Sequence, residues 1–192
     1  MMQYYQEITL LPDGDFSVYF LWGKIFTAVH IALVEQKNRH DVTDIAVSFP
    51  QYGEISLGNK LRILAEEEQS LELLDIKKVL RRFDDYVHIT GIRTIPTARI
   101  KGYAMYSRYQ PDSSIHQKAR RYSARHSDIS YEQALTILKS KDRHTDLPYI
   151  QMRSMTNHNP FRLFIKRTET EETDCHEFGS YGLSSNSAVP EF

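Results

Sequence analysis

Short runs of alternating or β-branched residues and longer runs with an apolar face succeed one another along the first half of the chain. Four segments predict strands: 3–10, 44–49, 59–64 and 86–90. Two segments predict helices, 16–36 and 66–85. Asp15 is placed to cap the first helix, and Glu66 begins the second with the negative charge that a helix N-terminus favours. The order strand, helix, strand, strand, helix, strand over residues 1–96 predicts a ferredoxin-like domain.

The second half, residues 97–192, predicts a smaller α/β domain and so completes an α+β fold. Its elements are predicted as a strand over 98–109, a helix starting at 111–113, a second helix from Ser130 through Ser140, and strands over 148–153 and 161–167. Ser130 and Gln133 have the spacing of a capping box. The polar, acidic residues 168–177 predict a mobile loop.

Composition narrows the class of protein. The chain has 192 residues, 41% of them hydrophobic, so it can bury a core without disulfides. Its single cysteine, Cys175, can form neither an intramolecular disulfide nor a site of several thiolates. The start of the chain lacks the pattern of a secretory signal, and no apolar run reaches the roughly 18 residues of a membrane span. We therefore expect a cytoplasmic protein with no membrane partner.

Charge is distributed unevenly, and this suggests a partner. Residues 1–96 carry a net charge of −4, residues 97–167 carry +9, and residues 168–192 carry −6. At 100° per residue, Lys118, Arg121 and Arg125 fall on one side of the predicted arginine-rich helix, whereas Arg120 points elsewhere. Such a stripe favours a polyanion such as nucleic acid, because cations that neutralise phosphates gain from counterion release. The alternative is a solvated face that balances the acidic ends.

The candidate chemistry is that of a histidine acting without a cofactor. Phosphate-loop and dinucleotide-binding glycine patterns, HExxH and paired cysteines are missing, so we expect no cofactor and no metal. A nuclease of this kind must use its side chains to activate the 2′-hydroxyl of RNA, which suits a histidine. His30 lies in the apolar run AVHIALV, where a polar ring is costly unless it lies at the edge of a site. The competing interpretation is a partly buried structural histidine.

Nine short motifs, in order along nearly the whole chain, resemble one known family. They are HIALV at 30–34, VSFP at 47–50, LG..LRI at 57–63, SR.Q at 107–110, RR...RH at 120–126, LP....RS at 147–154, FRLFI at 161–165, YGLS at 181–184 and VP.F at the end. Together they resemble the CRISPR-repeat-processing endoribonucleases of type I-F systems. These enzymes combine a ferredoxin-like domain with a smaller domain that bears an arginine-rich helix.

The resemblance implies an enzyme that binds a hairpin in precursor CRISPR RNA. It would cleave at the 3′ base of the stem without a metal, through attack of the 2′-hydroxyl that leaves a 2′,3′-cyclic phosphate. It would then keep the mature crRNA bound, together with other subunits of a type I-F surveillance complex. The family's general base maps onto His30, its pocket serine onto Ser154, and the tyrosine that helps position the histidine onto Tyr181.

The RNA-binding positions follow from the same resemblance. Arg108 and Gln110 match a pair that reads base edges low in the stem, a task for which arginine suits guanine and glutamine suits adenine. Phe161 matches an aromatic residue that stacks under the base next to the cleavage site, and Thr156 takes the place of a second family hydroxyl beside Arg153 and Ser154. The helix that follows the major groove of the stem corresponds to Arg120, Arg121 and Arg125, with Lys118 on the same basic stripe.

The residues on their own leave other interpretations open. Ser154 and Thr156 also fit an ordinary turn, and Tyr181 also fits a core aromatic whose hydroxyl is satisfied. At the level of function, the main alternative is a hairpin-binding subunit of a CRISPR ribonucleoprotein that does not cleave. A further alternative is a basic scaffold that binds RNA without regard to sequence.

Overall fold

Two antiparallel sheets, with helices packed on the first of them, form a mixed α+β fold, which confirms the predicted class. The computed structural model describes residues 1–40, 43–110, 115–126, 129–141 and 146–192. The first sheet contains β1 (Tyr4–Leu10), β2 (Ala46–Ser48), β3 (Lys60–Ala65), β4 (Val87–Ile89) and β5 (Arg93–Thr94). The strand order is β2-β3-β1-β4, and β5 also pairs with β1. All four predicted strands of the first half are therefore present, and β5 is an addition.

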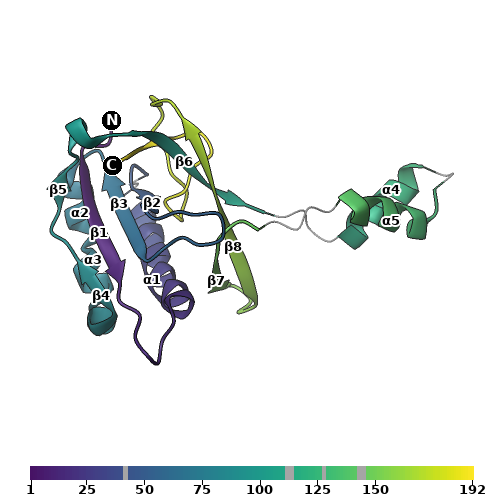
Figure 1. Cartoon of the computed structure of the whole chain (residues 1–192), viewed down its shortest axis with the longest axis horizontal. Coiled ribbons are helices and arrows are strands. Elements are labelled where there is room, and N and C mark those ends of the chain that lie inside the picture. Colours follow the sequence, from purple (N-terminus) through teal and green to yellow (C-terminus); the bar gives the residue numbers. More distant parts are fainter. Residues whose placement is uncertain (41–42, 111–114, 127–128, 142–145) are drawn as a thin grey trace. The chain divides into compact units, whose positions relative to one another are not determined.

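The first helix, α1 (Val18–His40), packs on one face of this sheet and also against β7 (Tyr149–Arg153) of the second sheet (Figure 1). Its buried residues are Leu21, Trp22, Ile25, Phe26, Ala28, Val29 and Leu33. By length and composition α1 could also cross a membrane, although no apolar run of that length was expected from the sequence. In the fold, these seven side chains form part of the hydrophobic core.

The capping of α1 differs from the prediction. The amide of Phe20 donates to the hydroxyl oxygen of Ser17, so Ser17 caps the helix and Asp15 does not. The carboxylate of Asp13 instead accepts hydrogen bonds from the amides of Asp15 and Phe16, which closes the preceding turn. The turn therefore uses the acidic side chain that precedes the predicted cap.

One long helix was predicted over 66–85, and the structure has three short segments. They are α2 (Glu68–Leu74), α3 (Ile76–Val79) and a 3₁₀ helix, η1 (Arg81–Tyr86). Asp75 separates the first two because its backbone is left-handed, with a φ of 42°. Its amide caps the end of α2, and its side chain accepts from the amide of Lys78 at the start of α3. Aspartate tolerates this conformation better than most residues, and the pattern of apolar positions does not reveal it.

The second sheet contains β6 (Gly102–Tyr109), β7 (Tyr149–Arg153), β8 (Pro160–Thr170) and β9 (Val189–Glu191), in the order β7-β8-β6-β9. A short 3₁₀ turn, η2 (Thr97–Arg99), precedes β6. The strand β8 extends into the acidic stretch, up to Thr170. The rest of that stretch is hydrogen-bonded to the segment before β9, through Thr173 to the amide of Ala188 and through the amide of Glu177 to Ser187. Residues 168–170 therefore belong to β8, whereas residues 171–177 form a loop, as predicted, that is hydrogen-bonded to the segment before β9.

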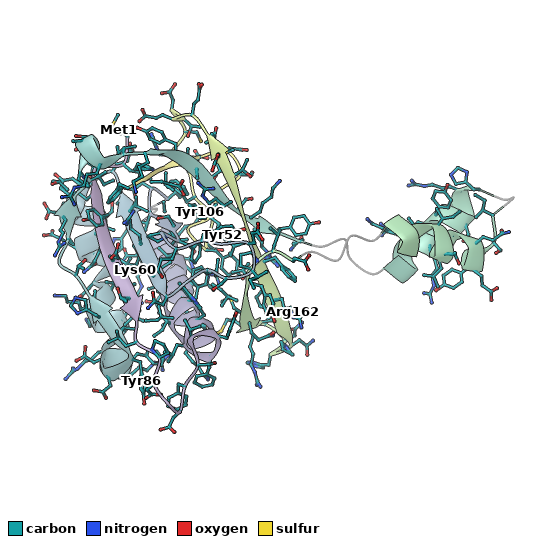
Figure 2. The ribbon with its side chains drawn as sticks, in the orientation of Figure 1. Met1, Tyr52, Lys60, Tyr86, Tyr106 and Arg162 are labelled. Atoms are coloured by element: carbon teal, nitrogen blue, oxygen red, sulfur yellow. The ribbon has the colours of Figure 1, made fainter. Side chains whose placement is uncertain are left out.

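Aromatic and polar contacts join the two sheets. The ring of Tyr106 on β6 lies 5.6 Å from that of Phe49 and 6.1 Å from that of Tyr52, measured between centroids (Figure 2). The hydroxyl of Tyr106 donates to Glu191, which also pairs with Arg167. Apolar residues from both sheets belong to the same buried cluster. A single core therefore extends across the two sheets.

Contacts divide the chain into two units whose bounds differ from the division expected at residue 96. One unit comprises residues 1–108 and 147–192, because the two sheets share a core, and the other comprises residues 109–146. The second unit is a pair of helices, α4 (Ile115–Arg125) and α5 (Tyr131–Lys141), with Ala119 and Ala134 buried. Ser130 and Gln133 form the predicted capping box before α5. The predicted start of α4 at 111–113 lies outside the described residues.

Candidate active site

His30 lies on α1 at the edge of the packed face, where its ring is partly exposed and lines a pocket of about 430 Å³. Its Nδ1 lies 2.7 Å from the carbonyl oxygen of Ser180. Because a carbonyl oxygen can only accept a hydrogen bond, Nδ1 carries the proton in this contact. In the neutral ring, Nε2 then has the lone pair. The histidine is therefore held in the tautomer that a general base needs.

A tight turn over 179–182 places the Ser180 carbonyl. The amide of Gly182 donates to the carbonyl of Gly179, and the amide of Gly179 donates to the carbonyl of Leu183. The carbonyl of Gly182 in turn accepts from the amide of Val47 on β2, at 2.9 Å. Gly182 has a φ of 68°, which favours glycine. The turn is thus fixed to the first sheet, and so is the acceptor that orients His30.

Tyr181 stacks on the ring of His30. The two centroids are 4.0 Å apart and the planes differ by 11°, while Phe26 lies nearly parallel to Tyr181 at 6.4 Å. The stack and the Ser180 hydrogen bond restrain the imidazole plane in two directions. Tyr181 is therefore both a partly buried aromatic and a direct neighbour of the His30 ring.

Burial is the main cause that lowers the pKa of His30 below its ordinary value. The hydrogen bond to the Ser180 carbonyl opposes this effect, and the positive charge of Arg108 lowers the pKa further. All three follow from the position of the ring at the edge of the core. The neutral ring, which accepts protons, is accordingly the main form near pH 7.

The turn between β7 and β8 forms the other side of the pocket. Ser154 lines it, and its hydroxyl oxygen accepts from the amides of Thr156 and Asn157 at 3.3 and 3.4 Å. The amide of Ser154 donates to the carbonyl of Asn159, which closes the turn. Ser154 thus has the structural role that the sequence left open, and it also faces the same pocket as His30.

Arg108 at the end of β6 is a further wall of this pocket. Its guanidinium carbon lies 5.7 Å from the ring centroids of both Phe161 and Tyr181. The sequence predicted Arg108 as a base reader and did not place it next to the histidine. A positive charge at this position can also attract a phosphate.

The pocket unites most of the predicted site residues. Its lining is Thr27, His30, Arg108, Met152, Arg153, Ser154, Met155, Thr156, Asn157, Asn159, Pro160, Phe161 and Tyr181. Thr27, Asn157 and Asn159 were not predicted from the sequence. Thr27 lies one helical turn before His30 and so could have been found from helix periodicity. The two asparagines lie in a turn, where asparagine is common for structural reasons.

The other predicted RNA-binding residues lie in the second unit. Gln110 is exposed just after β6, Arg120, Arg121 and Arg125 are exposed on α4, and Lys118 is partly buried there. The four cationic side chains give α4 a positively charged surface. Among residues 1–40, 43–110, 115–126, 129–141 and 146–192, no group of three His, Cys, Asp or Glu side chains is arranged to hold a metal ion.

The pH dependence of the pocket's chemistry follows from the lowered pKa of His30. If the neutral ring is the active form, activity rises with pH through that pKa and levels off above it. For a reaction in which His30 accepts a proton, we expect the rising limb of kcat/KM to have its midpoint below 6.5, the ordinary pKa of histidine. Arg108→Ala should move this midpoint upward, because it removes a positive charge that lowers the pKa. A limb centred above 6.5 in the unsubstituted protein would contradict the assignment.

Comparisons with known proteins agree with one another. The family model for the CRISPR-associated protein Cas_Csy4 matches residues 5–192. A protein from Escherichia coli (strain UTI89 / UPEC), "CRISPR-associated endonuclease Cas6/Csy4", is 33% identical over 193 residues, with all of both chains covered. A protein of the same description from Pseudomonas aeruginosa (strain UCBPP-PA14) is also 33% identical, over 195 residues, again with all of both chains covered.

Proposed function

We propose a function from one premise, which is that the chain belongs to the Csy4 family of CRISPR-associated proteins. The proposed function is that of an endoribonuclease that cuts precursor CRISPR RNA at the 3′ base of the repeat hairpin and keeps the mature crRNA bound. The observation that carries this proposal is the pocket that His30 lines together with Ser154 and Arg108. In this pocket, Nδ1 of His30 is hydrogen-bonded to the Ser180 carbonyl. The descriptions of the relatives support the class of reaction.

The proposed reaction is a transesterification. Nε2 of His30 accepts the proton of the 2′-hydroxyl as the 2′-oxygen attacks the neighbouring phosphorus. The bond from phosphorus to the 5′-oxygen breaks, which leaves a 2′,3′-cyclic phosphate and a 5′-hydroxyl once that oxygen takes up a proton. Ser154 accepts two amide hydrogens, so its own hydroxyl hydrogen can point to the 2′-oxygen and orient it. The positive charges of Arg108 and Arg153 suit the charge that develops on the phosphate.

Recognition of the hairpin is assigned to both units. Phe161 would stack under the base next to the cut, and Arg108 and Gln110 would read base edges low in the stem. The cations of α4, which are Lys118, Arg120, Arg121 and Arg125, would hold the stem phosphates. A-form RNA has a deep, narrow major groove, so this helix would contribute affinity more than sequence specificity.

The proposal also covers the fold of the first sheet, the cellular location and the partner subunits. The strand order β2-β3-β1-β4, with the helices on one face, supports a ferredoxin-like arrangement for the first sheet. We place the protein in the cytoplasm, where it would bind other subunits of a type I-F complex around the crRNA.

The test uses CRISPR repeat RNA from the genome that encodes the protein, incubated with the protein in EDTA. A second RNA has a 2′-deoxy nucleotide before the scissile phosphate. We expect cleavage of the first RNA to a 2′,3′-cyclic phosphate, and binding without cleavage of the second. Cleavage of the deoxy RNA would overturn the mechanism. Tight binding of both RNAs without any cleavage would favour the hairpin-binding subunit.

A further inference from the structure

A row of side chains on α1 leads out of the pocket. Thr27 lines the pocket, Lys24 comes three residues earlier and Phe20 four residues before that. Residues at these spacings are neighbours on one face of a helix. With a rise of 1.5 Å per residue, Phe20 lies about 10 Å along the axis from Thr27. The row continues the pocket surface over a distance that fits about two nucleotides.

Phe20 is an exposed aromatic ring that packs against other aromatic side chains of the fold. Its exposed fraction is 48%, although large apolar side chains are usually buried. The ring stacks on Phe16 at a centroid distance of 5.1 Å, and Phe16 meets Tyr86 edge-on at 5.4 Å. The ammonium group of Lys24 lies 5.5 Å from the Phe20 centroid. Phe20 is thus held in place by Phe16, and the ammonium group of Lys24 lies over its ring.

A stacked aromatic ring beside a cation is the combination that binds single-stranded nucleic acid. The ring offers a platform for a base of any sequence, and the ammonium group pairs with a backbone phosphate. No feature of the catalytic pocket requires Phe20 to be exposed, because that pocket is complete at Thr27. Phe20 and Lys24 are therefore available to a ligand that extends beyond the pocket.

We propose that Lys24 and Phe20 bind the unpaired RNA on the 3′ side of the scissile phosphate, with Lys24 on a phosphate and Phe20 under a base. This rests on the proposed function, in which Arg108 and Phe161 face the stem. The α1 side of the pocket is then left for the strand that departs after the cut. Asp13 and Asp15 are exposed in the turn before Phe16. Their carboxylates would repel the phosphates of a longer RNA and so limit the site to about two nucleotides.

The experiment compares the affinity of several protein variants for two RNAs that differ only in the length of their unpaired 3′ end. Hairpin RNA with a 2′-deoxy nucleotide at the cleavage site is prepared in two forms, one ending at the nucleotide after the cut and one with two more unpaired nucleotides. For the unsubstituted protein, the longer RNA should bind about tenfold more tightly. Phe20→Ala and Lys24→Ala should each lose most of that gain and keep the affinity for the short form. Phe20→Trp should retain the gain, because tryptophan keeps a stacking surface.

Matched controls lie on the same helix. Tyr19 is 57% exposed but one residue away from the row, and Lys37 is exposed near the other end of α1. Tyr19→Ala and Lys37→Ala should keep the tenfold gain. The affinity of Lys24→Ala for the longer RNA should also depend less on salt than that of the unsubstituted protein. The slope of log K against log salt should become shallower by about 0.7.

Three results would overturn the proposal. One is an equal affinity of the unsubstituted protein for both RNAs, and another is a gain that survives Phe20→Ala and Lys24→Ala. The third is a loss of the gain in Ser185→Ala, which would place the strand in a separate hollow of about 360 Å³ beyond Tyr181. If the short hairpin itself is neither bound nor cut in its 2′-hydroxyl form, the proposed function has failed, and this result is separate from the other three.

Discussion

Replacing His30 with alanine should lower the single-turnover cleavage rate by a factor of about 10² to 10⁴, while the Kd for the repeat hairpin changes by less than about threefold. The base acts on the 2′-hydroxyl during the reaction and adds little to binding of the substrate. Its removal also leaves no buried polar group unsatisfied, because the Ser180 carbonyl at the pocket edge can accept a hydrogen bond from water instead. The rate is measured with protein in excess over labelled RNA, and the Kd is measured with the 2′-deoxy hairpin.

The control for this substitution is His88→Ala. His88 is exposed on β4, and it does not line the pocket, so neither the rate nor the Kd should change. Loss of hairpin affinity in parallel with the rate in His30→Ala would make His30 a structural residue. A rate within threefold of the unsubstituted protein would show that another group accepts the proton.

The pattern of polar and apolar residues locates His30 but not what holds it. A polar ring within AVHIALV is visible in the sequence because it interrupts an apolar run. Its partner is the backbone carbonyl of Ser180, 150 residues away, and any residue type can supply a carbonyl. Arg108 reaches the same pocket only because β6 lies beside β8 in the second sheet. Contacts of this kind depend on long-range pairing, which local periodicity does not contain.

The same distinction holds for the fold. Long periodic segments, such as those that became β1 and α1, are predicted with errors of a few residues at their ends. The strand β5 has only two residues, and the three-residue β9 contains Pro190, which argues against a strand. The equally short β2 and β4 were predicted because they lie within longer apolar or β-branched runs. The break of the second helix depends on one left-handed residue, Asp75, in a segment whose charges and apolar spacing otherwise suit a continuous helix. Sequence reasoning therefore misses elements that a single backbone conformation or a distant pairing decides.

Gly182 is the position at which the anchoring of the site is most sensitive to a small change. A Cβ atom there would lie 2.7 Å from Cγ1 of Val47 and 3.1 Å from its amide nitrogen. Val47 is 1% exposed on a short strand of the first sheet, so it has little room to move. The φ of 68° adds the cost of a left-handed conformation for any residue with a Cβ.

Gly182→Ala should therefore lower the free energy of unfolding by about 2 to 4 kcal/mol, as measured by urea denaturation. Because the turn carries the Ser180 carbonyl, the substitution should also change the midpoint of the pH profile of cleavage, which a loss of stability alone does not move. Gly91→Ala is the control, since a Cβ atom there meets nothing within 4 Å and the change should cost less than about 0.5 kcal/mol. Val47→Ala in the Gly182→Ala background removes the clashing methyl group, so the two substitutions together should cost less than the sum of each alone. Additive costs, with an unchanged pH profile, would show that the turn does not position His30.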